Sequence, residues 1–484
     1  MMWLVAAGLV LLLLYLGTRK PRGYPPGPPR LPLMGYIPFM DANLPHKKLW
    51  RLSSTYGPVV GLFFGNQPAV VVNGWEAVKE ALMNEDLNGR PESVFTTGAY
   101  NGTYGVMFVE GEFWKEQRRF TLHQFRNLGF AKRSHEEIVH EEVRAVIQEI
   151  RETKGSITLL GMLGVSSINI LWAVMGGKRF SRDDPRLMDL VLVLNKVFRA
   201  GEISGGISQA MPFLAHYLPK SNPYHVVLSG FRQSSDFLKA AIEEHKATLD
   251  PDNPRDFIDT YLVEMAKQKH DPNSTFAEHQ LMATCTDIFM AGTETGSASV
   301  SFGILLMALH PEIMARVQKE LDEVVGRERL PSFEDRNKLV YTDATLSEVF
   351  RFRGAAPVTV PHKAMRDTIL QGHRIPADTM LLVNLYTIQM DPEYWGDPET
   401  FRPERFLNPD GSYRKDERHI PFGKGRRICL GESLARMTSF VLFTSLLQNF
   451  TFTLDPAVPV PNTEGKSGFT LGPPEFRVFA KPRV

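Results

Sequence analysis

Residues 422–432 read FGKGRRICLGE, and the apolar run SLARMTSFVLFTSLLQNF follows at 433–450. The apolar run predicts a long buried helix, so Cys429 lies in a glycine-rich loop at the N-terminus of that helix. Three cations precede the cysteine within the same loop. Because a helix dipole and nearby cations both stabilise a thiolate, we expect the pKa of this thiol to be lowered. The segment therefore predicts a thiolate that acts either as a nucleophile or as a metal ligand.

The neighbours of Cys429 bear on this choice. A hydrolytic nucleophile needs a histidine base, which the sequence leaves open. We expect Gly425 and Gly431, on either side of the cysteine, to let a large flat group approach the backbone, as a haem requires and a nucleophile does not. The chain has one other cysteine, Cys285, in an apolar helical run, and we interpret it as a small buried side chain. Two cysteines in 484 residues exclude a disulfide framework.

The cysteine loop resembles a motif of a known family. Its fixed positions reproduce the FxxGxRxCxG pattern of the cytochrome P450 family, the haem-thiolate monooxygenases: Phe422, Gly425, Arg427, Cys429 and Gly431. Further motifs of that family occur in the expected order: WKEQR at 114–118, AGTET at 291–295, EVFR at 348–351 and FRPERF at 401–406. The resemblance covers essentially the whole chain and is closest to the animal microsomal branch, with an insect-like character. It implies an α+β, mainly α-helical cytochrome P450 fold with a minor β-sheet region.

The resemblance implies the cofactor and how it is held. Haem b is expected to be bound through Cys429 as the axial iron ligand, with Phe422 and Gly431 beside it. The remaining cofactor-binding residues, expected to hold the haem propionates, are Trp114, Arg118, Arg90, His362 and Arg427. Dioxygen is then the co-substrate. The chain has no flavin or nicotinamide motif, so electrons are expected to come from NADPH through a separate flavoprotein reductase.

The run at 281–308 is too apolar for a surface helix, yet Gly292, Glu294 and Thr295 interrupt its middle. A buried carboxylate beside a hydroxyl is costly unless it has a role. The resemblance implies that the helix opens locally here, that Thr295 contacts dioxygen, and that Glu294 feeds protons toward it. Satisfied polar residues of the core are the alternative.

Two further groups of charged residues are assigned. Glu348 and Arg351 lie three residues apart, hence on one helix face, and Arg405 is expected to complete a structural Glu-Arg-Arg network behind the cysteine loop. The net charge of +1 gives no global attraction to nucleic acid, so any basic face must be local. A local patch for the acidic surface of the reductase is expected from Lys115, Arg118, Arg119, Arg126, Lys132, Arg133, Lys424 and Arg426. Part of that run must instead face the haem.

The substrate pocket follows from family analogy alone. Its expected members are apolar: Phe95, Phe198, Phe289, Ala291, Val358, Val360, Phe469 and Leu471. They predict a lipophilic substrate, and a fatty acid, a juvenile-hormone-type terpenoid, a steroid and a foreign compound all stay open. Two other functions also stay open: a haem-thiolate isomerase or synthase that does not use dioxygen, and a non-catalytic haem sensor. Both would be free to lose the acid-alcohol pair, which is intact here.

The N-terminus predicts a membrane anchor. The run at 1–17 carries no charge, and cations follow it at Arg19, Lys20 and Arg22. As a helix it spans about 25 Å, close to the roughly 27 Å hydrocarbon core of the endoplasmic reticulum. The cations on its C-terminal side favour a cytosolic catalytic domain; a cleaved signal peptide is the alternative. We thus expect an anchor at 1–20, a proline-rich hinge at 21–36 and a single catalytic domain at 37–484.

The body shows no repeat or second linker. Residues 59–72 predict a β-hairpin with its turn at Gly65-Asn66, and short strands are expected near 369–384. Helical periods dominate elsewhere, notably at 135–152, 226–249, 278–308 and 311–325. Phosphate-loop, dinucleotide and serine-hydrolase motifs are absent, and two histidines five residues apart, at 135 and 140, do not make a zinc motif. The Asn-x-Thr sequons at 101, 273 and 449 are expected to be unglycosylated in the cytosol.

Overall fold

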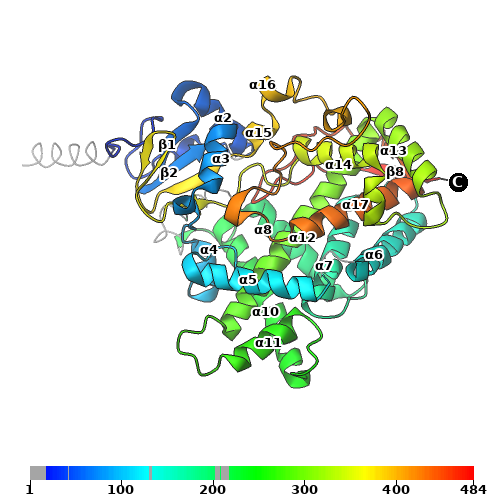
Figure 1. Cartoon of the computed structure of the whole chain (residues 1–484), viewed down its shortest axis with the longest axis horizontal. Helices are drawn as coiled ribbons and strands as arrows, with labels where there is room; N and C mark the ends of the chain where they lie inside the picture. The colour runs from blue at the N-terminus through cyan, green and yellow to red at the C-terminus, as the bar shows by residue number, and fades with distance from the viewer. Residues whose placement is uncertain (1–17, 42, 130–132, 202–207, 209–216, 484) are drawn as a thin grey trace, which may run out of the picture.

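The computed structural model describes residues 18–483 except 42, 130–132, 202–207 and 209–216. The expected anchor run at 1–17 and the basic residue Lys132 lie outside the described residues. In Figure 1 the main sheet lies at one end of the molecule, and helices fill the remainder.

Helices make up most of the described chain. Their bounds are α2 (Pro45–Tyr56), α3 (Trp75–Met83), α4 (Val94–Tyr100), α5 (Gly111–Asn127), α6 (Arg133–Glu152), α7 (Leu159–Met175), α8 (Pro185–Ala200), α10 (Pro223–Thr248), α11 (Phe257–Lys267), α12 (Glu278–Leu309), α13 (Pro311–Val324), α14 (Val340–Phe352), α15 (Tyr386–Gln389), α16 (Pro392–Trp395) and α17 (Glu432–Asn449). The four helices predicted from periodicity are confirmed as α6, α10, α12 and α13 within a few residues. Local signals start several helices: Asp184 and Asn222 cap α8 and α10, and a proline follows each cap.

Helix α12 forms the axis of the helical part. It is 32 residues long, and every residue from Ala283 to Met290 is buried. It packs against α7, α8, α10, α13, α14 and α17, and Figure 1 shows it running through the middle of the molecule. A helix that is apolar nearly all round must be buried on all sides, which explains its central position.

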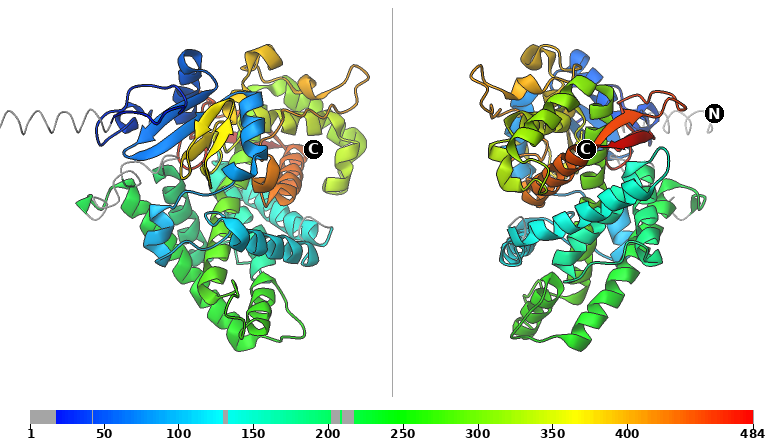
Figure 2. Two further views of the ribbon diagram at one scale, coloured as in Figure 1. Left: turned by 60° about the vertical axis from the view of Figure 1, so that its left-hand side comes forward. Right: turned by 90° about the vertical axis from the view of Figure 1, so that its right-hand side faces the viewer.

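The main sheet has the strand order β1-β2-β6-β3. The predicted hairpin is confirmed: β1 (Val59–Phe64) and β2 (Gln67–Val72) pair antiparallel, and β2 pairs parallel with β6 (Met380–Val383). Side chains alternate between two apolar clusters, one with α3 and one with α2, so each face of the sheet is covered by a helix. The other strands are β3 (His362–Lys363), β4 (Thr368–Leu370), β5 (His373–Ile375), β7 (Phe450–Leu454) and β8 (Val478–Pro482). Figure 2 shows the sheet from the side.

Among the described residues, no single helix has the length and hydropathy of a membrane span. Helices α12 and α13 pass such a test only as a pair, and the pair is bent by 110°.

Candidate active site

Cys429 lies between the 3-10 turn at Gly425–Arg427 and the start of α17. Its backbone N–H donates to the Phe422 carbonyl at 3.0 Å, which closes the loop. The Phe422 ring packs edge-on against Phe350 of α14, with 5.5 Å between ring centroids. The loop is therefore fixed to α14 on one side and to α17 on the other, and α17 packs on α12.

The thiol of Cys429 is accessible. The protein around it nevertheless desolvates it, and burial raises its pKa, while the N–H of Gly431 and the charge of Arg118 act in the opposite direction. The predicted lowering of this thiol pKa is therefore wrong for the isolated protein, because the cost of desolvating a thiolate outweighs the dipole and the cations. Cys429 is thus accessible, yet the surrounding protein penalises a charged sulfur there. A bound metal cation deprotonates such a thiol outright, so a ligand role is compatible with the raised pKa.

The two loop glycines do different things. Gly425 has φ +77°, and a Cβ there would lie 2.2 Å from the carbonyl oxygen of Leu82 in α3. The expectation that Gly425 makes room for a flat group is therefore wrong, since the space it leaves is taken by backbone. No described atom lies within 4 Å of a Cβ built on Gly431. The expected close approach of a flat group is thus compatible with Gly431 only.

One face of α12 is accessible. Ala291 and Thr295, one turn apart, are half-buried, whereas Gly292 and Gly296 face Leu171 and Ser167 of α7 and the other neighbours along the helix are almost all buried. The expected local opening is wrong: the helix is continuous from Glu278 to Leu309. The Thr295 hydroxyl donates to the Ala291 carbonyl at 2.7 Å, one turn back, so it is satisfied without any break in the helix. Thr295 therefore presents a hydroxyl on the accessible face.

Glu294 has other partners than the resemblance implied. It is 2% exposed. One carboxylate oxygen accepts from Arg199 Nη2 at 2.5 Å and the other from the Thr470 hydroxyl at 2.5 Å. The expectation that Glu294 feeds protons to the site is therefore wrong in this structure, because both oxygens are occupied by groups of α8 and of the C-terminal loop.

A cationic cluster lies beside the cysteine loop. Arg427 stacks on the Trp114 ring, with 3.7 Å between Cζ and the ring centroid. Arg118, on the same helix as Trp114, donates to the carbonyl of Ile428 at 2.5 Å. Two donors in the cluster, Trp114 Nε1 and Arg427 Nη1, have no hydrogen-bond partner among the described residues. Buried donors without acceptors are costly, so this cluster is built to receive an acceptor.

Electrostatics support the same conclusion. Arg90 is buried and donates to the Met107 and Pro361 carbonyls, each at 3.0 Å. Burial and the charges of Arg427 and Arg118 lower its pKa well below the ordinary value, and burial with the charge of Arg118 lowers the pKa of Arg427 to about 9. Crowded guanidinium groups that depress one another's pKa favour an anionic partner. The two carboxylates of a haem fit this cluster and its unused donors.

His362 lies buried next to Arg90 of this cluster. It is 2% exposed, and burial together with the charge of Arg90 lowers its pKa well below 6.5. Its Nδ1 lies 3.0 Å from the Leu87 carbonyl. This contact engages one ring nitrogen with the backbone, and the role of the other nitrogen toward a propionate stays a prediction.

The three charged residues assigned to a network come together. Arg351 donates to both oxygens of Glu348, at 2.6 and 2.8 Å, and Arg405 donates to the same carboxylate at 3.3 Å. Arg351 and Glu348 are fully buried, which rejects an exposed ion pair. Arg351 also donates to the carbonyls of Gln389 and Pro398, and Arg405 donates to the carbonyl of Trp395. The network thereby ties α14 to the loops at 389–405.

Only some of the expected pocket residues meet. The rings of Phe95 and Phe198 both pack edge-on against Phe469, at centroid distances of 5.8 and 6.3 Å. The Leu471 N–H donates to the Ala355 carbonyl at 2.8 Å, which fixes the same turn. Ala291 lies on the accessible face of α12. These residues come from α4, α8, α12 and the loop 466–472.

Three other pocket assignments fare differently. Phe289 is wrong as a member of this group, since its ring packs on Trp172 and Phe237, on the side of α12 that faces α7 and α10. Val358 is also wrong, because it packs into the cluster between the main sheet and α2. Val360 is 36% exposed, and its assignment to the pocket stays a prediction.

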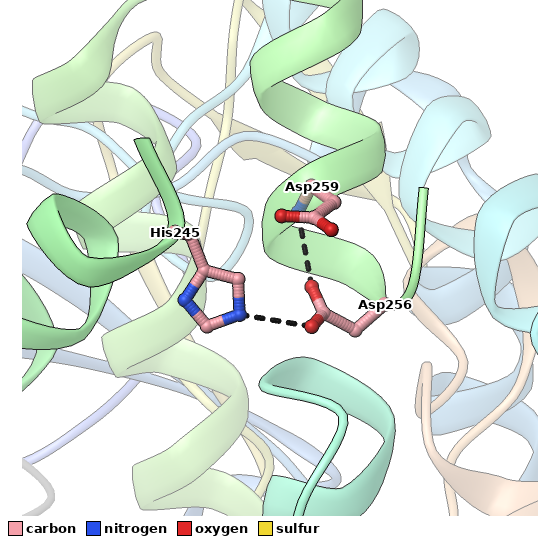
Figure 3. Close-up of side chains that lie close together, drawn as sticks. All are labelled: His245, Asp256 and Asp259. Carbon is pink, nitrogen blue, oxygen red and sulfur yellow. Dashed lines mark hydrogen bonds and ion pairs between the residues drawn. The ribbon is translucent and has the colours of Figure 1, made fainter. Parts of the chain in front are cut away.

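A second group of possible metal ligands lies far from the cysteine in sequence. Figure 3 shows His245 at the end of α10 facing Asp256 and Asp259 at the start of α11. Every candidate ligand atom has a partner: His245 lies 2.7 Å from the Ala241 carbonyl and 2.9 Å from Asp256, and Arg255 donates to Asp259. These hydrogen bonds join the end of α10 to the start of α11, and a metal ion could bind these three side chains only by displacing them.

Three residues of the structure had no role assigned from the sequence: Arg199, Thr470 and Asp287. Arg199 and Thr470 hold Glu294, as described above. Asp287, a lone acid in the apolar stretch of α12, accepts from the N–H groups of Val106 and Met107 at 2.7 and 2.8 Å, and burial raises its pKa to about 7. Glu294 was singled out because it is an acid within an apolar helix, and the same signal was available for Asp287. Their partners were not predictable, because they lie on loops remote in sequence. The isolated thiol of Cys285 is buried, as predicted.

Comparisons with known proteins agree with the geometry. The family model described as Cytochrome P450 matches residues 25–480. Cytochrome P450 2C28 of Mesocricetus auratus is 38% identical over 483 residues, covering 98% of this chain and 97% of the relative. Cytochrome P450 2B4 of Oryctolagus cuniculus is 38% identical, with coverages of 98% and 96%, and Cytochrome P450 2J3 of Rattus norvegicus is 36% identical, with coverages of 99% and 96%.

Proposed function

The chain belongs to the cytochrome P450 family of haem-iron monooxygenases, and from that premise we propose that it hydroxylates or epoxidises a lipophilic small molecule with one atom of dioxygen. Haem, when bound, supplies the iron at which dioxygen is reduced by electrons that originate in NADPH. The observation that carries the proposal is the accessible thiol of Cys429 beside a cationic cluster with two unused donors.

Each side chain of the site has a proposed role. Cys429 binds the iron, and Trp114, Arg118, Arg427 and Arg90 hold the propionates through charge-assisted hydrogen bonds. The Thr295 hydroxyl, on the accessible face of α12, positions a proton for the oxygen chemistry. Glu348, Arg351 and Arg405 keep α14 and the cysteine loop in place.

The substrate class follows from the lining. Phe95, Phe198 and Phe469 form an aromatic wall, and its chemistry favours a ligand bound by burial of apolar surface. We propose a fatty acid, a terpenoid, a steroid or a foreign compound of comparable apolarity. A panel of these four classes, incubated with the purified protein, the flavoprotein reductase and NADPH, tests this. Oxygenated products from one class support the proposal, and none from any class contradicts it.

We propose that the reductase docks on the exposed cations of α5 and the cysteine loop. Arg119 and Arg126 are exposed, and neither forms an ion pair within the part of the chain that the structure describes. Lys115 and Arg426 are exposed but pair with Glu112 and Glu85. Arg118 points inward to Ile428, so it belongs to the haem side of the helix.

We propose an endoplasmic reticulum membrane location with a single N-terminal anchor and a cytosolic catalytic domain. The uncharged run at 1–17 followed by Arg19, Lys20 and Arg22 supports it. Removal of residues 2–20 is expected to release a folded haem protein without detergent, and glycan on Asn101, Asn273 or Asn449 would contradict the orientation.

A haem-thiolate isomerase or synthase and a haem sensor are the alternatives. One measurement separates both alternatives from a monooxygenase. Only a monooxygenase should consume dioxygen and NADPH when the protein is combined with its reductase and substrate. The accessible hydroxyl of Thr295 favours the monooxygenase, because neither alternative needs a proton donor on that face of α12.

A further inference from the structure

The chain carries an ion pair between a buried carboxylate and a half-buried arginine that the reaction does not explain. Glu294 of α12 and Arg199 at the end of α8 are 95 residues apart in sequence and meet at 2.5 Å. Within the described residues, Arg199 also donates to Thr470 at 3.2 Å and to the Lys466 carbonyl. One guanidinium thus joins a core helix, the end of a second helix and the C-terminal loop.

The backbone around this ion pair is unusually close. The Phe469 N–H donates to the Phe198 carbonyl at 2.9 Å. A Cβ on Gly468 would lie 1.9 Å from that same carbonyl, and one on Gly472 would lie 2.9 Å from the Arg199 guanidinium. Lys466 and Gly472 bridge each other, so the loop 466–472 is a closed turn that presents Thr470 and Phe469 toward α8.

The aromatic wall of the pocket sits on this junction. Phe198 directly precedes Arg199, and Phe469 directly precedes Thr470. Each ring therefore has its position set by the neighbour that contacts Glu294. A buried carboxylate with both oxygens accepting charge-assisted hydrogen bonds holds its partners in one geometry, whereas apolar packing alone permits several.

We propose that Arg199, Glu294 and Thr470 form a latch that fixes the Phe198 and Phe469 rings and so limits the size of ligand the pocket accepts. These three are positioning residues that act through the rings. This inference rests on the proposed function only in assigning those rings to the substrate pocket. It gives Glu294 a role that does not involve proton delivery.

The variants are chosen to separate the latch from simple loss of stability. Removing Arg199 alone leaves the buried charge of Glu294 unpaired, which is strongly destabilising. The double variant Arg199→Met with Glu294→Gln removes both charges and is the main test. Thr470→Val removes the hydroxyl at nearly constant shape, and Thr470→Ser restores it. Arg186→Met is the matched control, because Arg186 is an exposed arginine at the other end of the same helix, where it pairs with Asp184.

Two measurements on the haem-loaded protein, both without turnover, decide the matter. The first is the ratio of the dissociation constants of 4-phenylimidazole and the bulkier clotrimazole, followed by the shift of the haem absorption band. The second is hydrogen–deuterium exchange of peptides that contain the Phe469 N–H. In the double variant and in Thr470→Val, we expect the ratio to change at least about tenfold in favour of clotrimazole binding and exchange at Phe469 to rise. In Thr470→Ser and Arg186→Met, we expect the ratio and the exchange to stay at the parent values.

An unchanged ratio and unchanged exchange in a folded, haem-loaded double variant would overturn the latch. So would a Glu294→Gln variant that lowers product per NADPH while both measurements stay at the parent values, since that result assigns Glu294 to proton delivery. Neither measurement requires dioxygen chemistry. A protein that fails to oxidise any substrate but shows the expected shifts therefore contradicts the proposed function and leaves the latch standing.

Discussion

At the scale of single residues, Cys429 and Cys285 are a natural pair for an experiment. Cys429 is accessible at the start of α17, and Cys285 is buried in α12. We expect Cys429→Ser to abolish the thiolate-type absorption of the reduced carbon monoxide complex, because a serine hydroxyl does not replace the soft anionic sulfur. Cys285→Ser is the matched control and should keep that absorption. Retention of the band in Cys429→Ser would show that another group binds the iron.

Thr295 also has a matched neighbour. Thr293 donates to the Phe289 carbonyl at 2.6 Å just as Thr295 donates to Ala291, but Thr293 is buried. We expect Thr295→Ala to keep haem and NADPH consumption while product per NADPH falls and hydrogen peroxide rises. Loss of a proton-delivery contact costs on the order of 10² to 10⁴ in the dependent step.

Thr293→Ala removes the same backbone hydrogen bond away from the accessible face and should leave the product-to-NADPH ratio unchanged. Equal behaviour of the two variants would assign Thr295 to helix structure. Measuring peroxide, product and retained haem in the same samples separates these outcomes.

At the scale of elements, the helices that sequence periodicity predicted are those with one apolar side or with an apolar run long enough to cross the core. Helix α7 was missed because it is apolar nearly all round and only 17 residues long, so it has no contrasting polar face. The hairpin β1–β2 was predictable from its turn. The strand β6 falls within the short strands expected near 369–384, but its parallel pairing with β2, some 310 residues earlier, was not predictable, because no local signal sets long-range strand pairing.

The junction of α10 and α11 in Figure 3 predicts a pH dependence. Burial alone would lower the pKa of His245, but the Asp256 carboxylate and the Ala241 carbonyl outweigh it and raise the pKa. A raised pKa in the folded state means that the stabilisation is fully present below the ordinary value of 6.5 and is lost as pH rises through the folded value.

We therefore expect the thermal unfolding midpoint to decline as pH rises above 6.5, and His245→Gln to remove part of that decline. The measurement is circular dichroism at a series of pH values between 6 and 9, in steps of about half a unit. Exposed His123 of α5 is the control position, and His123→Gln should track the parent protein. An identical slope in His245→Gln and the parent would contradict the imidazolium assignment.

At the scale of the whole molecule, the sequence motifs were sufficient to place the cysteine loop, the Glu-Arg-Arg network and most of the cationic cluster. They failed where a role depends on which way a side chain turns. Phe289 and Glu294 both lie on α12 within six residues of Thr295, yet their partners belong to different sides of the helix. The predicted direction of the Cys429 pKa shift was wrong for a related reason, because the degree of desolvation follows from the packing of segments remote in sequence.

The proposed docking of the reductase on α5 predicts how surface charge affects electron transfer to the whole molecule. Arg119 and Arg126 contribute exposed positive charge beside the cysteine loop, and an acidic partner is steered to such a patch by long-range attraction that salt screens. We expect Arg126→Glu, alone and with Arg119→Glu, to raise the apparent KM for the reductase by roughly tenfold at low ionic strength, with a smaller difference at about 0.5 M salt. Lys239→Glu makes the same charge change at an exposed site on α10 and serves as the control. Reduction driven by dithionite needs no partner and should be equal in all four proteins, so a defect there would indicate a damaged haem site. If Arg126→Glu and Lys239→Glu weaken the reductase equally, the effect belongs to net charge, and the docking surface lies elsewhere.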